Sequence, residues 1–86
     1  MYDIIFNNEK NVIYKNLRLL RRKHGFSQEQ LAAKMQLMNV NLNQQMISAI
    51  ERNRRFVTDY ELACFCRVFG VTTKEMLSDF YEKYPE

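Results

Sequence analysis

Residues 41–55 read NLNQQMISAIERNRR, with four amide side chains ahead of an apolar pair and three arginines at the end. The apolar pair, Ile47 and Ile50, has the three-residue spacing of one helix face. Asn43 precedes the first helical position, where a side-chain oxygen can cap backbone amides. The pattern predicts a short helix over residues 43–52, with its isoleucines facing a core and polar residues on its other side.

Helix start signals lie on both sides of this stretch. Three segments fit the capping box, in which a hydroxyl and the third residue after it cap each other's backbone amides: Ser27–Gln30, Thr58–Glu61 and Thr72–Glu75. Each is followed by apolar residues at helical spacing, and an earlier apolar stripe stops near Gly25. We therefore predict five helices, over about residues 9–24, 28–37, 43–52, 59–69 and 73–82.

Length and composition favour one small all-helical domain spanning residues 1–86, with loose ends at 1–8 and 83–86. The 86 residues are 47% hydrophobic, which suits a packed globule, and two glycines with one proline leave little room for hairpins. No apolar run is long enough to cross a membrane, and the first residues lack the basic flank of a signal peptide. We expect a cytoplasmic protein that has no membrane partner.

Charge is divided unevenly along the chain. Residues 10–55 contain ten Lys or Arg and two acids, a net charge of +8, whereas residues 56–86 have a net charge of −3. A basic half of this kind is suited to a polyanion such as DNA. The alternative is a solvated basic face with no partner.

Many positions resemble, in register, the helix-turn-helix family of Cro/repressor type, often called XRE. These positions are Leu20-Arg21, Gly25 to Gln28, Leu31-Ala32, Ile47-Ser48, Ile50-Glu51 and Asn53, followed by Leu62, Phe69-Gly70-Val71 and Leu77. The resemblance covers about residues 13–80, with the motif itself at about 27–52. It implies a five-helix, lambda-repressor-like DNA-binding domain. The implied function is a sequence-specific regulator of double-stranded DNA, a repressor of phage or mobile-element type that reads the major groove with its third helix.

The sequence departs from the family pattern in two places. The connection over residues 36–42 is about five residues longer than the usual tight turn, so we expect an extended turn between the second and third helices. Asn53 stands where the family commonly has glycine, and asparagine is the residue next best suited to the left-handed backbone that ends a helix.

The resemblance assigns base reading to the start of the third helix, at Asn43, Gln44 and Gln45, and Ala49 lies one turn further along the outward face. A glutamine amide donates and accepts at once, so it can pair with adenine N6 and N7, and an alanine methyl can contact the thymine methyl. Asn43 is also the expected helix cap. The alternative for both glutamines is an ordinary solvent-exposed helix start.

The resemblance also implies phosphate contacts around that helix, by Gln28, Arg52, Asn53, Arg54 and Arg55. Gln28 opens the second helix, where free amides and the helix dipole favour an anion, and Gln44 is expected to support it. The alternative for the arginines is a solvated loop. Arg21 and Glu51 are expected to form a structural salt bridge between the first and third helices instead.

No residues suggest an enzyme, a metal site or a cofactor. Cys64 and Cys66 are two apart on a helix and point to different faces, and His24 has no second ligand at metal-binding spacing. No nucleophile–base pair, carboxylate pair or phosphate-cradling glycine loop occurs.

We expect a homodimer on a palindromic operator, because one small reading head contacts few bases. The aromatic residues near the C-terminus are the candidate dimer surface, although core packing is the commoner role for them: Phe69, Phe80, Tyr81 and Tyr84. The alternative function is a protein-binding module of the same fold, such as an antitoxin, that uses the apolar 36–42 connection as its partner surface.

Overall fold

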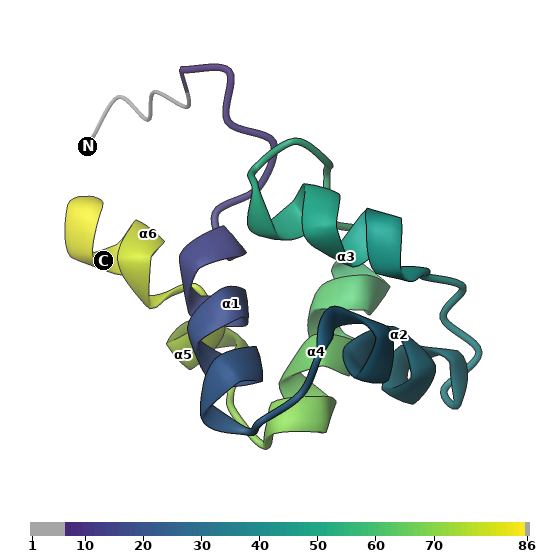
Figure 1. Ribbon diagram of the computed structural model, residues 1–86. Helices are drawn as coiled ribbons and strands as arrows, with labels where there is room; N and C mark the ends of the chain where they lie inside the picture. The colour runs from purple at the N-terminus through teal and green to yellow at the C-terminus, as the bar shows by residue number, and fades with distance from the viewer. Residues whose placement is uncertain (1–6, 86) are drawn as a thin grey trace.

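The computed structural model describes residues 7–85, which contain six helices and no strand (Figure 1). Their bounds are α1 Tyr14–Lys23, α2 Gln28–Gln36, α3 Gln44–Glu51, α4 Asp59–Phe69, α5 Thr73–Met76 and α6 Ser78–Lys83. The predicted all-helical class is therefore confirmed. Part of each end that we expected to be loose, residues 1–6 and 86, lies outside the described residues.

All three predicted capping boxes form. The side chains of Ser27, Thr58 and Thr72 each accept a hydrogen bond from the backbone amide three residues on, and the backbone amide of each donates in return to the Gln or Glu side-chain oxygen at that position. These bonds satisfy amides that the first helical turn leaves without partners. They fix the starts of α2, α4 and α5 where the sequence predicts them.

Four helices are closed by a residue with left-handed backbone geometry. Gly25, Asn39, Asn53 and Gly70 follow α1, α2, α3 and α4 with φ between 57° and 72°. In each case the amide after this residue reaches back five positions to a helix carbonyl, at 2.8–3.1 Å. This closure reverses the chain and leads it into the next element.

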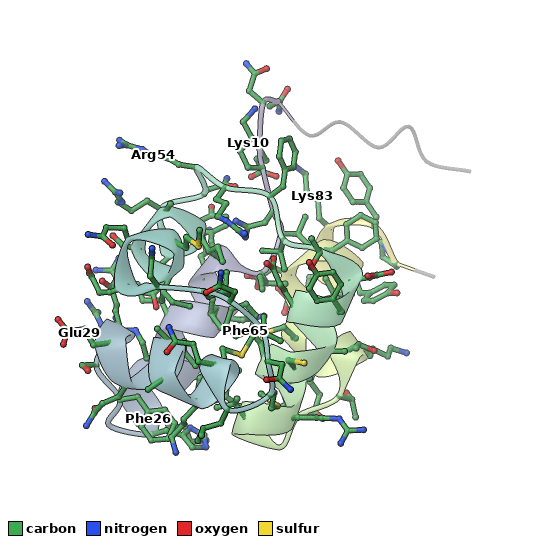
Figure 2. All side chains as sticks on the ribbon, turned by 90° about the vertical axis from the view of Figure 1, so that its right-hand side faces the viewer. Lys10, Phe26, Glu29, Arg54, Phe65 and Lys83 are labelled. Carbon is green, nitrogen blue, oxygen red and sulfur yellow. The ribbon has the colours of Figure 1, made fainter. Side chains whose placement is uncertain are left out.

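The core lies where α1, α2, α3 and α4 meet. The largest fully buried side chains are Leu17, Leu31, Met35, Leu42, Ile47, Ile50, Phe65 and Met76. Phe65 of α4 lies among them, in the interior of the side-chain view (Figure 2). Both isoleucines of α3 are fully buried, as their spacing predicts. The core therefore sets the depth and the rotation of α3.

The extended turn between α2 and α3 is ordered by its own side chains. Val40 and Leu42 point into the core and are 6% and 0% exposed. The side-chain amide of Gln36 donates a 2.8 Å hydrogen bond to the Leu42 carbonyl and closes the loop. Leu37 is the one apolar side chain of this connection that is exposed, at 85%. Most of the apolar content of this connection is thus folded into the protein, which leaves little of it for a partner surface.

The first helix begins at Tyr14 and not near residue 9, so that part of our prediction is wrong. The backbone amides of Lys10 and Asn11 donate to the side-chain oxygen of Asn53, at 2.9 and 3.0 Å. The side-chain amide of Asn11 in turn donates to the backbone carbonyls of Ile50 and Arg55. These bonds hold residues 10–13 against the end of α3 in a non-helical conformation, so the helix starts after them.

The predicted helix over residues 73–82 is divided at Leu77 into α5 and α6. The Asn16 side chain on α1 donates to the Met76 carbonyl and to the Ser78 hydroxyl, at 3.0 and 2.9 Å. In a continuous helix that carbonyl would accept from the Phe80 amide, which bonds to Leu77 instead. A side chain from the first helix therefore creates this break.

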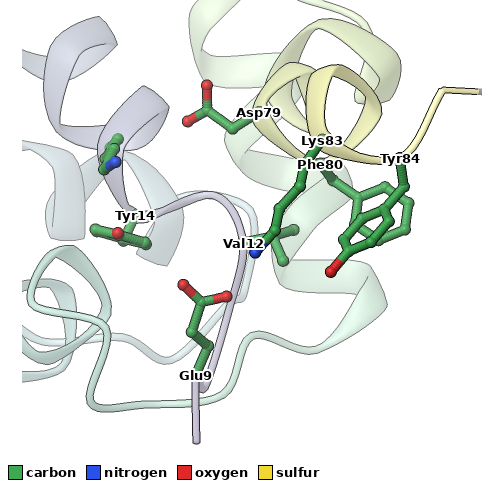
Figure 3. A pocket seen from close by; sticks show the side chains of 8 residues that line it. Glu9, Val12, Tyr14, Asp79, Phe80, Lys83 and Tyr84 are labelled. Carbon is green, nitrogen blue, oxygen red and sulfur yellow. The ribbon is translucent and has the colours of Figure 1, made fainter. Parts of the chain in front are cut away.

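The C-terminal aromatic residues do not share one surface. Phe69 is only 6% exposed and belongs to the core, so it is unavailable to a dimer contact. Phe80 and Tyr81 on α6 and Tyr84 just after it are half-buried. Between α6 and the segment before α1 lies a pocket of about 200 Å³ (Figure 3). Its lining is Glu9, Val12, Tyr14, Lys15, Asp79, Phe80, Lys83 and Tyr84.

Candidate nucleic-acid interface

One face of α3 is polar and accessible, and the opposite face is fixed in the core. Gln45 and Arg52 are exposed, and Ser48 and Ala49 between them are half-buried. These positions are three, four and seven apart, so they form one helical stripe. Burial of Ile47 and Ile50 turns this stripe outward.

Asn43 caps α3. Its side-chain oxygen accepts a 2.9 Å hydrogen bond from the Met46 amide, and its own backbone is extended. The cap engages the oxygen, and the Nδ2 group of this exposed side chain is available to an outside contact.

Gln44 does not stand free at the helix start. Its Nε2 donates to Oε1 of Gln28 at 2.6 Å, and the Gln28 Nε2 donates to Oε1 of Glu51 at 3.2 Å. Gln28 is at the start of α2, beside α3 (Figure 1). The two glutamines that the sequence assigns to phosphate and base are therefore in direct contact. With Glu51 and Arg21 they form a chain of hydrogen bonds, which we call the amide relay.

The relay ends in the Arg21–Glu51 ion pair that the resemblance implies. Nε and Nη2 of Arg21 donate to the two carboxylate oxygens of Glu51 at 2.6 and 2.9 Å, and Nη1 donates to the Phe26 carbonyl at 2.8 Å. The side chains are only 12% and 3% exposed. The hydrogen bonds to Glu51 raise the pKa of Arg21 above its ordinary value, despite the opposing effect of burial. This pair ties α1 to the end of α3.

Two of the predicted phosphate ligands, Arg52 and Arg54, are exposed. Arg52 donates weakly from Nε to the Ser48 carbonyl, at 3.3 Å. Arg54 extends from the loop after α3 (Figure 2), with no hydrogen-bond partner for its side chain among residues 7–85. Both cations are thus available to an anion beside the exposed stripe of α3.

The other two residues of this loop have internal partners. Asn53 uses its side-chain oxygen to hold the amides of Lys10 and Asn11. Arg55 donates to both oxygens of Glu61 at 3.0 and 3.1 Å, and also to the Phe56 carbonyl. Burial alone would raise the pKa of Glu61, but hydrogen bonds from Arg55 and Thr58 hold it below its ordinary value.

Two further residues join this surface without having been selected from the sequence. Ser48 lies on the exposed stripe of α3, and its spacing from Gln44 and Gln45 is a signal that could have identified it. Lys10 is brought next to the loop by Asn53, with its ammonium 5.0 Å from the centre of the Phe56 ring (Figure 2). No local pattern reveals this placement of Lys10.

Residues 7–85 offer no metal site and no membrane-spanning helix. No cluster of three or more His, Cys, Asp or Glu side chains is placed to bind a metal ion. None of the described helices is long and apolar enough to cross a membrane. Cys64 is half-buried and Cys66 buried, as free thiols, and burial raises the pKa of the Cys66 thiol.

Comparison with known proteins identifies the family. A family model described as helix-turn-helix matches residues 17–76, well over half of the chain, from α1 to the end of α5. No curated protein and no solved structure matches the sequence. The matched range contains the whole amide relay and the loop after α3. The chain therefore belongs to the helix-turn-helix family of Cro/repressor (XRE) type and is a DNA-binding regulator.

Proposed function

We propose that this protein is a sequence-specific repressor of the phage or mobile-element type that reads the major groove of DNA with α3. The single observation that carries the proposal is the amide relay. Gln44 is held at the start of α3 with one Nε2 hydrogen bonded to Gln28. Its Oε1 and second Nε2 hydrogen remain for a base edge.

These groups suit adenine, which offers an acceptor at N7 and a donor at N6. Gln45 is exposed one residue further on and serves as a second reader. Ala49 supplies a methyl group, and Asn43 an Nδ2 donor. Arg52, Arg54 and Lys10 then contact phosphates, which positions the protein on the duplex but does not select a sequence.

We further propose that the protein binds as a homodimer to a two-fold operator, where occupancy of the DNA represses transcription. An apolar groove of about 540 Å³ beside the loop after α3 supports a protein contact near the DNA surface. Phe56 lines this groove and is 66% exposed, and the neighbouring Tyr60 is 60% exposed. Sedimentation analysis with and without a selected duplex tests the dimer.

The experiment that tests base reading is selection of bound duplexes from a random pool, repeated with Gln44→Ala and Gln45→Ala. Each variant is expected to lose preference at one or two positions of each half-site, since a paired amide contributes about 1–3 kcal/mol of discrimination. Unchanged preference in both variants would remove these residues from the reading role.

The second candidate function is a protein-binding module of antitoxin type, and the exposed Phe56 of the apolar groove favours it. Binding to random duplex at low salt separates the two functions. A DNA-binding protein weakens steeply as salt rises, because each neutralised phosphate releases counterions. Absence of any duplex binding at low salt would favour the protein-binding function.

A further inference from the structure

We infer that Glu51 is a positioning residue for base reading: through Gln28, it fixes which way the Gln44 amide faces. The inference rests on the proposed role of Gln44 as a reader. It assigns a second role to the Arg21–Glu51 pair, beyond joining α1 to α3.

A glutamine amide has no fixed polarity of its own. Its oxygen and its NH₂ group have nearly the same shape, so a half-turn of the amide exchanges an acceptor for two donors. For a residue that reads DNA this exchange alters which base is preferred, because adenine presents an acceptor and a donor whereas guanine presents two acceptors.

Glu51 removes this freedom from Gln28. The carboxylate can only accept hydrogen bonds, and both its oxygens are held by Arg21 in a site where the Glu51 side chain is 3% exposed. Gln28 must therefore present Nε2 to Glu51, at 3.2 Å, which turns its Oε1 toward Gln44.

The same restriction applies to Gln44, the next residue of the relay. Oε1 of Gln28 only accepts, so Gln44 must present Nε2 to it, at 2.6 Å. Gln44 is left with Oε1 and one N–H for the base, the pair that adenine matches. If the side-chain amides of Gln28 and Gln44 both rotated by half a turn, the Gln44 oxygen would accept a hydrogen bond from Gln28. The Gln44 NH₂ group would then face the DNA groove. Two donors of that kind suit N7 and O6 of guanine.

The test compares Glu51→Gln with Glu61→Gln. Glu61 is a matched control, since it is also buried and bound through both oxygens by an arginine, but it contacts neither glutamine of the relay. Duplex selection is run with both variants and with Gln44→Ala, which identifies the position that Gln44 reads. At that position Glu51→Gln is expected to lower the adenine-over-guanine preference about fivefold or more. Glu61→Gln is expected to leave it unchanged.

A DNA-free measurement accompanies the selection. In the ¹⁵N–¹H spectrum of the free protein, one Nε2 proton of Gln44 should be shifted and exchange slowly because it is hydrogen-bonded to Gln28. We expect Glu51→Gln to abolish this signature and Glu61→Gln to keep it. If Glu51→Gln does not fold, the double variant Arg21→Met with Glu51→Leu replaces the ion pair by apolar side chains, which proteins often tolerate, and keeps both glutamines. The same loss of preference and of the Gln44 signature is expected in it.

Wild-type base preference together with a wild-type Gln44 signal in Glu51→Gln, or in the double variant if Glu51→Gln does not fold, would overturn the inference. If Gln44→Ala leaves base preference unchanged, the proposed reading role fails. In that event the spectrum still decides whether Glu51 orients the two amides, so the two failures are distinguishable.

Discussion

Arg55 and Glu61 form a bidentate ion pair across the loop that joins α3 to α4. The arginine donates to both carboxylate oxygens, at 3.0 and 3.1 Å, and the Glu61 side chain is only 5% exposed. The neighbouring Arg54 is exposed and points away from the protein. Adjacent arginines of one basic run therefore have different surroundings, and their substitution should have different effects.

Arg54→Ala is expected to weaken binding to all duplexes about equally and to lower the salt slope of the binding constant by about one. Its free energy of unfolding should stay within about 0.5 kcal/mol of the wild type, because no internal contact is lost. Salt-dependent fluorescence anisotropy and urea unfolding measure the two quantities.

Arg55→Ala is the matched variant and should mainly affect folding. It leaves the Glu61 carboxylate buried without its partner, which should lower the free energy of unfolding by about 2–3 kcal/mol. This loss of unfolding free energy is smaller than the loss expected for a fully buried ion pair, because 29% of the Arg55 side chain is exposed. A variant that unfolds like the wild type but loses its salt slope would show that Arg55 binds phosphate instead.

The lowered pKa of Glu61 predicts how stability depends on pH. A carboxylate whose pKa is lower in the folded protein stabilises the fold fully above its ordinary value of 4.5, and this contribution is lost as the pH falls through the folded pKa. In Glu61→Gln the free energy of unfolding should therefore fall less steeply than in the wild type as the pH is lowered. Some slope should remain, because hydrogen bonds from Thr72 also lower the pKa of Glu75. Urea unfolding between pH 7 and 3 tests this, and identical slopes would contradict it.

Asn53 combines a left-handed backbone with a clamp on the N-terminal segment. Asn53→Gly keeps the backbone geometry and loses the clamp, whereas Asn53→Ala loses both. The alanine variant should therefore be less stable than the glycine variant by roughly 1 kcal/mol. In both, the amides of Lys10 and Asn11 should lose protection from hydrogen exchange. Protection that survives in either variant would mean that other contacts hold residues 10–13.

The extended turn offers two leucines in opposite surroundings. Leu42→Ala removes a fully buried side chain and should cost about 2–5 kcal/mol of unfolding free energy. Leu37→Ala removes one that is 85% exposed and should change stability by less than about 0.5 kcal/mol. Thermal unfolding of both variants checks this, and a destabilising Leu37→Ala would point to a contact made outside the single chain.

Local signals predicted the helix starts well. Ser27, Thr58 and Thr72 cap in the structure because a capping box depends only on residues three apart. The two failures in helix bounds have distant causes. Asn53 fixes the chain ahead of α1, and Asn16 interrupts the C-terminal helix, over separations of 43 and 60 residues. Side-chain hydrogen bonds of such range leave no mark in a local pattern.

Sequence reasoning about the site was strongest where one helix decides the outcome. Burial of Ile47 and Ile50 sets the outward face of α3, so the accessibility of Gln45 and Arg52 follows from spacing alone. The different surroundings of Arg54 and Arg55 do not follow, since both read as members of one basic run. Lys10 joins this surface because Asn53 and Asn11 tie the segment that carries it to the end of α3.

The hydrogen bonds from Lys10 and Asn11 to Asn53 can form only late in the synthesis of this domain. The partners of Asn53, the amides of Lys10 and Asn11, leave the ribosome long before residue 53 does. Closing so long a loop carries an entropic cost that a neighbouring contact avoids. The segment ahead of α1 can therefore take its native place only after α3 and the loop beyond it have emerged.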